Sequence, residues 1–311
     1  MIKFIKYKQI NMNKNIKFSE KKRPHSHIFH DLSKSINGLQ SKNKIFLFYI
    51  LVLFIVLQFD FSYSDQYSIT IKISGGMGDQ QILNENFLPQ PNKVFYNNEE
   101  INFGVNNTIS SLGEGVLTIK MEWGQNQILN FERMFENLKN LIEVDFSEAE
   151  ITDASSGSMA YMFSNCISLT SLQGLNSLKR YSVLNMANMF VNCTSLTSID
   201  FSNIDNTANL YLMDNLFKGC TNLKYVDFEG FNAQNVISMN NLFSNCTNLE
   251  YINFRNFAKG NQTQYTNMFE GVPDNLVYCK DNSSDIDNII SLLNGNCALM
   301  ECDNYGKNKK N

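Results

Sequence analysis

The chain repeats one apolar pattern with a period of 26 to 27 residues, and this repeat limits what it can fold into. Each copy has apolar residues at positions i, i+3, i+4 and i+7, then leucine, a branched aliphatic residue and phenylalanine. The clearest copy reads Met186, Met189, Phe190, Cys193, Leu196, Ile199 and Phe201. A fixed period of this length indicates a solenoid, and repeats of about 20 to 29 residues belong to the leucine-rich class.

The two halves of each copy predict different elements. The spacing i, i+3, i+4, i+7 places its residues on one face of a short helix. The second half, L-x-x-I-x-F, is too short for another helix, and its branched and aromatic residues favour a short strand. We therefore expect an α/β solenoid, leucine-rich-repeat-like, with a short helix and a short strand in each coil of 26–28 residues. One coil cannot bury its own apolar face, so stacked coils complete the core.

The repeat extends over residues 131–279, which we take as the solenoid. Gly174 stands where a strand phenylalanine is expected, so that strand should be weaker or bulged. Pro273 interrupts the last copy, which starts at Tyr265 and should cap the array. One phenylalanine recurs in every copy, at Phe135, Phe163, Phe190, Phe217, Phe243 and Phe269.

The residues before the repeats divide into three parts. Residues 65–130 alternate apolar and polar residues, most clearly at Ser68 to Ile73 and at Leu117 to Trp123, and predict a small β-rich N-terminal cap. Leu117 to Trp123 should be the strand that caps the N-terminal end of the solenoid core, with Trp123, the only tryptophan, covering that end. Residues 1–44 hold eleven basic and two acidic residues and predict a disordered arm.

The third part, residues 45–64, contains thirteen consecutive apolar residues at 45–57. This length suits a secretory signal better than a full membrane span. Either the segment is a signal peptide cleaved before Asp65, or it is an uncleaved signal anchor whose basic arm stays in the cytoplasm. Both alternatives place the rest of the chain outside the cytosol, and only the second attaches it to the membrane.

The motif M-x-x-[ML]-F-x-x-C-x-x-L-x-x-[IV]-D-F, clearest from Met189 to Phe201 and again from Leu216 to Cys220, resembles that of a known family. The chain is similar to the BspA-type leucine-rich-repeat surface proteins, and more narrowly to their mycoplasma-lipoprotein-like repeat group. The similarity covers residues 131–279 and departs at Glu148, Ala149 and Gly174. It implies a secreted or surface-displayed protein that binds other proteins or cells.

Seven cysteines form two groups. Cys166, Cys193, Cys220 and Cys246 share one repeat position, and we favour a column of buried thiols there over disulfides between neighbours. Residues 280–311 form a tail with further cysteines. Disulfides are expected among Cys279, Cys297 and Cys302 in an oxidising compartment, with a connectivity that spacing leaves open.

Sequons make Asn106, Asn261 and Asn282 the glycosylation candidates. The sequons at Asn192 and Asn245 precede core cysteines, so we expect less access there.

The outward strand positions should form columns across the sheet. One column reads Asp145, Gln173, Asp200, Asp227 and Asn253, and its neighbour reads Glu143, Ser171, Ser198, Tyr225 and Tyr251. Adjacent like charges repel, so the aspartates fit either a cation or basic partner or a solvated polar face. The candidate partner-binding residues are Tyr225, Tyr251, Asp200, Asp227 and Asn253, because aromatic residues are enriched at interfaces.

Composition argues against two classes of function. No histidine follows Asp65, which removes the commonest general base, so we expect no enzyme, catalytic residue, cofactor or metal site. Residues 65–311 carry 15 basic and 27 acidic residues, a charge of −12 that disfavours nucleic acid. The sequence predicts an extracellular or cell-surface binding module that presents its repeat sheet to a protein or glycan. The alternative is a membrane-tethered coat protein without a specific ligand.

Overall fold

The computed structural model describes residues 67–110, 112–124, 128, 130–149, 156–178, 181–202, 204, 206–281, 286–293 and 297–300. The predicted basic arm and the apolar segment at 45–64 lie outside these residues. Within the described ranges, no helix has the length and apolarity needed to cross a membrane. All of the described residues belong to one compact unit.

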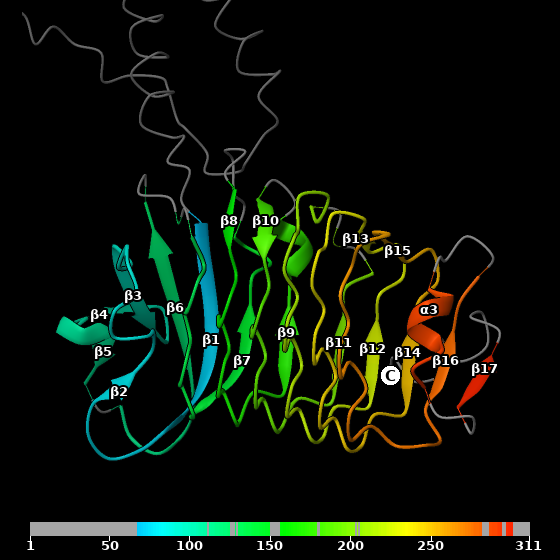
Figure 1. Cartoon of the computed structure of the whole chain (residues 1–311). Helices are drawn as coiled ribbons and strands as arrows, with labels where there is room; N and C mark the ends of the chain where they lie inside the picture. Colours follow the sequence, from blue (N-terminus) through cyan, green and yellow to red (C-terminus); the bar gives the residue numbers. More distant parts are fainter. Residues whose placement is uncertain are drawn as a thin grey trace, which may run out of the picture. The chain divides into compact units, whose positions relative to one another are not determined.

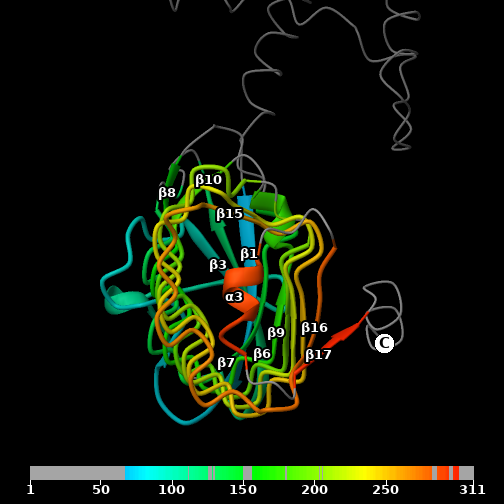
Figure 2. The same ribbon diagram turned by 45° about the vertical axis from the view of Figure 1, so that its right-hand side comes forward.

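This unit is a solenoid of stacked coils, as the repeat predicts (Figure 1). One strand from each coil joins a ladder along one wall, and Figure 2 shows turn-rich segments as the opposite wall. Ile199 pairs with Val226 and Val226 with Ile252, so the parallel register repeats every 27 or 26 residues. The ladder strands are β7 (Leu141–Asp145), β9 (Ser171–Gln173), β11 (Ser198–Asp200), β12 (Tyr225–Asp227), β14 (Tyr251–Asn253), β16 (Val277–Cys279) and β17 (Ala298–Met300).

The predicted helices are wrong: the chain is a β-solenoid and not an α/β leucine-rich repeat. Where a helix was expected, Met189 N–H donates to the Met186 carbonyl at 3.2 Å, which closes a four-residue turn. The Cys193 N–H closes the next turn on Phe190 at 3.1 Å. Alternate N–H groups, those of Met186, Asn188, Phe190 and Asn192, bond to the following coil, as that of Asn188 does to the Asp214 carbonyl at 2.8 Å. Two consecutive four-residue turns bury the same i, i+3, i+4, i+7 positions as a helix, so the apolar spacing could not separate them.

Asparagine explains why the backbone turns instead of continuing as a helix. Asn188 has φ 62° and Asn192 has φ 57°, each at the third position of its turn. A positive φ there, after a residue with ordinary φ, defines a type II turn, for which glycine and asparagine are the preferred residues. The asparagines with positive φ on this wall are Asn137, Asn165, Asn188, Asn192, Asn215, Asn241, Asn245 and Asn267.

Asn188→Ala is expected to lower the free energy of unfolding by about 1–2 kcal/mol, because alanine tolerates the left-handed region poorly. Asn188→Gly should leave stability nearly unchanged, since glycine adopts that conformation readily. A helix would give the opposite order, with glycine about 1 kcal/mol worse than alanine. Urea unfolding of the two variants measures this order, and a more stable alanine variant would contradict the turn geometry.

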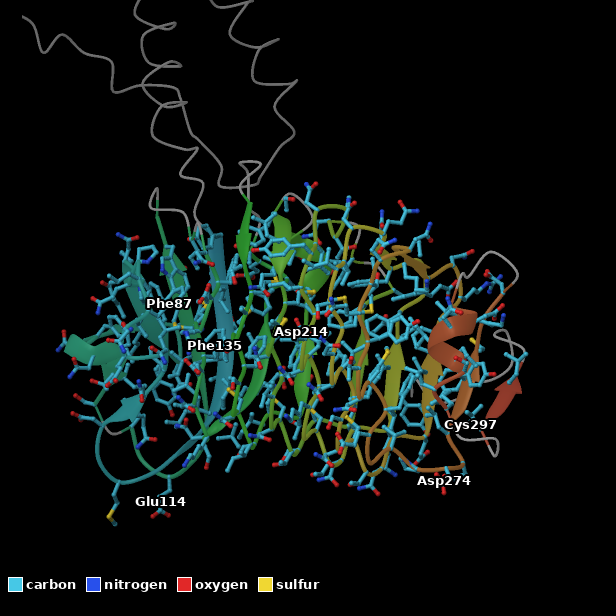
Figure 3. The ribbon with its side chains drawn as sticks, in the orientation of Figure 1. Phe87, Glu114, Phe135, Asp214, Asp274 and Cys297 are labelled. Atoms are coloured by element: carbon cyan, nitrogen blue, oxygen red, sulfur yellow. The ribbon has the colours of Figure 1, made fainter. Side chains whose placement is uncertain are left out.

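Phenylalanine columns fill the space between the two walls. The rings of Phe135, Phe163, Phe190, Phe217, Phe243 and Phe269 stack in succession, with centroids 5.3–5.6 Å apart. Phe201, Phe228 and Phe254 form a second column, at 5.6 and 6.1 Å. Figure 3 labels Phe135, the first ring of the longer column. Offset-stacked aromatic rings add about 0.5–1.5 kcal/mol per pair beyond the area that they bury.

The cysteines of the repeat are buried thiols, as predicted, and neighbouring ones form no disulfide. Each Sγ donates to a phenylalanine carbonyl of an earlier coil; that of Cys193 reaches Phe163 at 3.0 Å. Burial raises the pKa of the Cys246 thiol to about 12 and the pKa values of Cys193 and Cys220 well above their usual range. These thiols are therefore packing groups and not nucleophiles.

The strand ladder is interrupted once. β9 ends a six-stranded sheet of order β4-β3-β6-β1-β7-β9, whereas β11 begins a five-stranded sheet of order β11-β12-β14-β16-β17. Gly174 follows β9 with φ 71°, and the chain then enters the 3-10 helix η2 (Leu175–Leu178). The expected weak strand therefore lies where one sheet ends. Along another edge of the coils, β8 (Ser156–Ser158) pairs with β10 (Ser182–Asn185), and β13 (Asn232–Ala233) pairs with β15 (Ala258–Lys259).

The N-terminal cap continues the ladder with antiparallel strands. β1 (Tyr67–Gly75) pairs with β7, so this strand, and not the expected Leu117 to Trp123 segment, adjoins the first coil. Trp123 is fully buried, stacks on Tyr67 and donates from Nε1 to the Pro89 carbonyl at 2.9 Å. The other cap elements are β2 (Gln80–Gln81), β3 (Lys93–Tyr96), β4 (Glu99–Ile101), η1 (Val105–Asn107), β5 (Thr108–Ile109) and β6 (Gly115–Trp123).

At the other end, the short helix α3 (Asp287–Ile290) lies between the two walls (Figure 2). Ile286 and Ile289 are completely buried and belong to the core. They close the C-terminal end of the coils, so the exposed core face that a solenoid would otherwise leave is covered.

Candidate functional site

The outer face of the strand ladder brings together the members of the predicted columns on β11, β12 and β14, whereas the members on β7 and β9 pair with each other in the other sheet. Ser198, Tyr225 and Tyr251 are register partners on consecutive coils, as are Asp200, Asp227 and Asn253. Parallel strands lie about 4.7–4.9 Å apart, so each column is a continuous row of side chains.

The aspartate column has a structural role that the sequence analysis missed. In each of these strands the side-chain oxygen accepts the N–H two residues ahead, as in Asp200 from Ser202 at 2.9 Å and Asp227 from Glu229 at 3.0 Å. The same bond occurs at Asp145, at 2.8 Å, and at Asn253, at 2.9 Å. This is an Asx turn, which explains an Asp or Asn at each strand end without a bound cation.

Further contacts reduce the repulsion within the column. Asn253 donates from Nδ2 to Oδ1 of Asp227 at 2.9 Å and lies 3.4 Å from Oε2 of Glu229. Arg255 approaches Glu229 at 3.8 Å. The carboxylates of Asp200 and Asp227 still lie side by side on neighbouring coils, the first exposed and the second half-buried.

Tyr225 belongs to a second polar cluster on the same face. Its hydroxyl donates to Oε2 of Glu250 at 2.8 Å, and Nζ of Lys224 pairs with Oε1 of Glu250 at 3.0 Å. The Tyr225 side chain is half-buried, so these bonds fix the ring while leaving part of it accessible.

The expectation that Tyr251 and Asn253 are exposed is wrong. They are 5% and 7% exposed, and the Tyr251 hydroxyl and the Asn253 Oδ1 each lie 3.0 Å from Sγ of Cys279. Cys279 is disulfide-bonded and completely buried, and its sulfur lies against both side chains. The accessible part of the predicted site is reduced to Asp200, Tyr225 and Asp227.

Of the other candidate cysteines, the expectation of a disulfide is wrong for Cys297. Cys297 carries a thiol whose Sγ lies 3.5 Å from the Asp274 carbonyl, at the C-terminal end of the solenoid (Figure 3). Cys302 lies outside the described residues.

The sequons lie on the surface. Asn106 and Asn261 are exposed, and Asn282 falls outside the described residues. Asn192 and Asn245 are exposed too, although each precedes a core cysteine, because the turn points successive side chains in opposite directions. Asn192 already donates from Nδ2 to Oδ1 of Asn165 at 2.9 Å, a bond that glycosylation would disturb.

No cluster of three or more His, Cys, Asp or Glu side chains suited to a metal ion occurs among the described residues.

These features define a β-solenoid with a polar strand face and a closed aromatic core. The chain belongs to the family described as "Mycoplasma protein of unknown function, DUF285", whose model matches residues 92–210 and 157–278. The two matches overlap over residues 157–210, within the repeats. No curated protein and no solved structure shows a significant match to the chain.

Proposed function

We propose that the protein is a non-enzymatic binding or adhesion module, extracellular or at the cell surface, which presents its strand ladder to a protein or glycan partner. The observation that carries this proposal is the row of Asp200 and Asp227 beside Tyr225 on consecutive coils. The finer kinship with BspA-type surface proteins, based on the repeat motif, supports the same function. The thirteen apolar residues at 45–57 support export, with either cleavage or anchoring afterwards.

Charge favours a basic protein segment as the partner of this face. Asp200 and Asp227 add their negative potentials, and residues 65–311 carry a net charge of −12. Complementary potentials accelerate encounter and suppress partners of like charge. A half-buried tyrosine held by Glu250 adds a rigid aromatic contact, the type of residue that dominates interface energies.

Asp200→Asn together with Asp227→Asn is expected to weaken binding about tenfold, which corresponds to about 1.4 kcal/mol. Asparagine keeps the Asx-turn acceptor and removes only the charge, so the fold is preserved. Binding of the full chain to an array of lysine- and arginine-rich peptides, at low and physiological salt, measures the effect.

Asp145→Asn is the matched control, because Asp145 makes the same turn on β7 in the other sheet. It should leave peptide binding unchanged. Equal binding by the double variant and the unchanged chain would contradict the role of this face and favour a coat protein without a specific ligand.

A further inference from the structure

We infer a second binding surface, along the edge of the coils that carries β10, β13 and β15, and we assign to it a neutral, extended polysaccharide. We call this surface the amide face, and define it by Asn209, Tyr211, Gln234, Asn235 and Ile237, all of them exposed. In Figure 1 it lies at the top of the solenoid, above the strands β11, β12 and β14. It goes beyond the proposed function, which concerns the strand ladder.

Backbone register aligns these side chains. Bridges join Asn185 to Leu212, Leu212 to Ser238 and Ser238 to Gln264. The Tyr211 N–H donates to the Leu184 carbonyl at 3.0 Å, and the Ile237 N–H to the Tyr211 carbonyl at 2.9 Å. Tyr211 and Ile237 are therefore neighbours on adjacent coils, and Asn209 and Asn235 occupy the positions two residues before them.

Two apolar side chains remain exposed at the centre of the face. Tyr211 is 41% and Ile237 is 56% exposed, and they lie on adjacent coils. Half-buried Leu184 continues the column on the preceding coil. An exposed aromatic side chain within an apolar row is typical of a binding surface.

The flanking amides are fixed in position. Nδ2 of Asn209 donates to Oγ of Ser182 at 2.9 Å, and Nδ2 of Asn235 donates to the Ala208 carbonyl at 2.6 Å. Within the described ranges, no hydrogen bond is made to Oδ1 of either residue. Each amide thus offers an ordered acceptor and a second N–H donor beside the ring.

The face differs from the strand ladder in charge. No Asp, Glu, Lys, Arg or His occurs at 206–213, 230–249 or 260–269. The charged residues next to these segments include Lys259 of β15, which is 9% exposed, and Asp214, which accepts a hydrogen bond from the Ser238 hydroxyl. A charged ligand would find no counterion on these segments, whereas hydroxyl groups can both donate to and accept from amides. The negative face of an aromatic ring attracts the C–H edge of a pyranose. Coils about 4.7–4.9 Å apart repeat these contacts at a spacing close to one sugar of an extended chain.

Affinity electrophoresis of the full chain tests this inference, with the neutral glucans laminarin and hydroxyethyl cellulose as probes and polygalacturonate as an anionic comparison. We expect retardation by a neutral glucan, little change with salt, and at least about a tenfold loss of affinity in Tyr211→Ala. Tyr211→Phe should retain binding because it keeps the ring. Asn209→Ala with Asn235→Ala should lower the affinity, since it removes the ordered amides.

Ile167→Ala, at an exposed apolar residue of an earlier coil that belongs to neither surface, is the control and should bind the glucans normally. The inference would be overturned if neither glucan retarded the chain, or if only polygalacturonate did. It would also be overturned if Tyr211→Ala bound the glucans as tightly as the unchanged chain. Peptide binding that depends on Asp200 and Asp227 is measured separately, so either surface can fail without the other.

Discussion

Phe217→Ala is expected to lower the free energy of unfolding by about 3–5 kcal/mol, the usual cost of removing a buried aromatic side chain. The Phe217 ring is completely buried and stacks between Phe190 and Phe243, at 5.5 and 5.6 Å. It also contacts Phe201 and Phe228 of the second column, at 6.0 and 6.4 Å. Neighbours held by hydrogen bonds between coils cannot collapse into the space, so a cavity remains.

Phe269→Ala is the matched control, because Phe269 ends the same column, is only half-buried and stacks on Phe243 alone among the column rings. Its loss should cost clearly less than that of Phe217. Guanidinium unfolding followed by circular dichroism measures both variants, with the amplitude of each phase recorded because coils can unfold in groups. Similar small losses at both positions would show that the columns do not stabilise the fold.

The repeat predicted the stacking of the coils correctly because it reports side-chain burial directly. The Phe135 to Phe269 column, the buried thiols and the strand register all follow from equal positions in successive copies. Burial is a property of the side chain, so it can be read without knowing the backbone that presents it.

The backbone of the turn wall could not be predicted from the same signal. Met186, Met189, Phe190 and Cys193 are equally well buried by a helix and by two turns. In the four copies from residue 186 on, the distinguishing signal was a pair of asparagine or glycine residues four positions apart, as in Asn188 and Asn192, because these residues favour a positive φ. In the first two copies Arg133 and Tyr161 take the first position of the pair. Asparagine is also among the poorer residues for a helix interior, so the pattern argued against a helix throughout.

The exposure of the side chains on the strand ladder depends on contacts with other coils, which the sequence pattern of a single coil does not reveal. Alternation places Tyr251 and Asn253 outward, which is correct, but Cys279 of the next strand lies against both. The Asx turns at Asp200 and Asp227 were readable, since each aspartate ends a strand and is followed by a bend. The hydrogen bonds within one coil were thus predictable, whereas the contact of Tyr251 and Asn253 with a residue 28 and 26 positions further along the chain was not.

Gly174→Ala is expected to lower the free energy of unfolding by about 2–5 kcal/mol, and two separate costs contribute. The backbone there has φ 71°, where alanine costs about 1–2 kcal/mol. A Cβ atom would also lie 2.3 Å from the Ser147 nitrogen and 2.6 Å from the Phe146 carbonyl carbon. Backbone atoms cannot rotate away as a side chain can, so β7 and β9 must separate, and such overpacking costs about 1–3 kcal/mol more.

Gly230→Ala separates the two costs. Gly230 has nearly the same φ, 73°, but nothing lies within 4 Å of an added Cβ, so only the backbone cost of about 1–2 kcal/mol applies. The difference between the two variants in urea unfolding therefore measures how closely the coil at Gly174 approaches β7. Equal losses would mean that the coils relax freely at this junction. A larger loss at Gly174 would show that glycine is required where the first sheet ends, because only a residue without Cβ lets the next coil pack against Ser147.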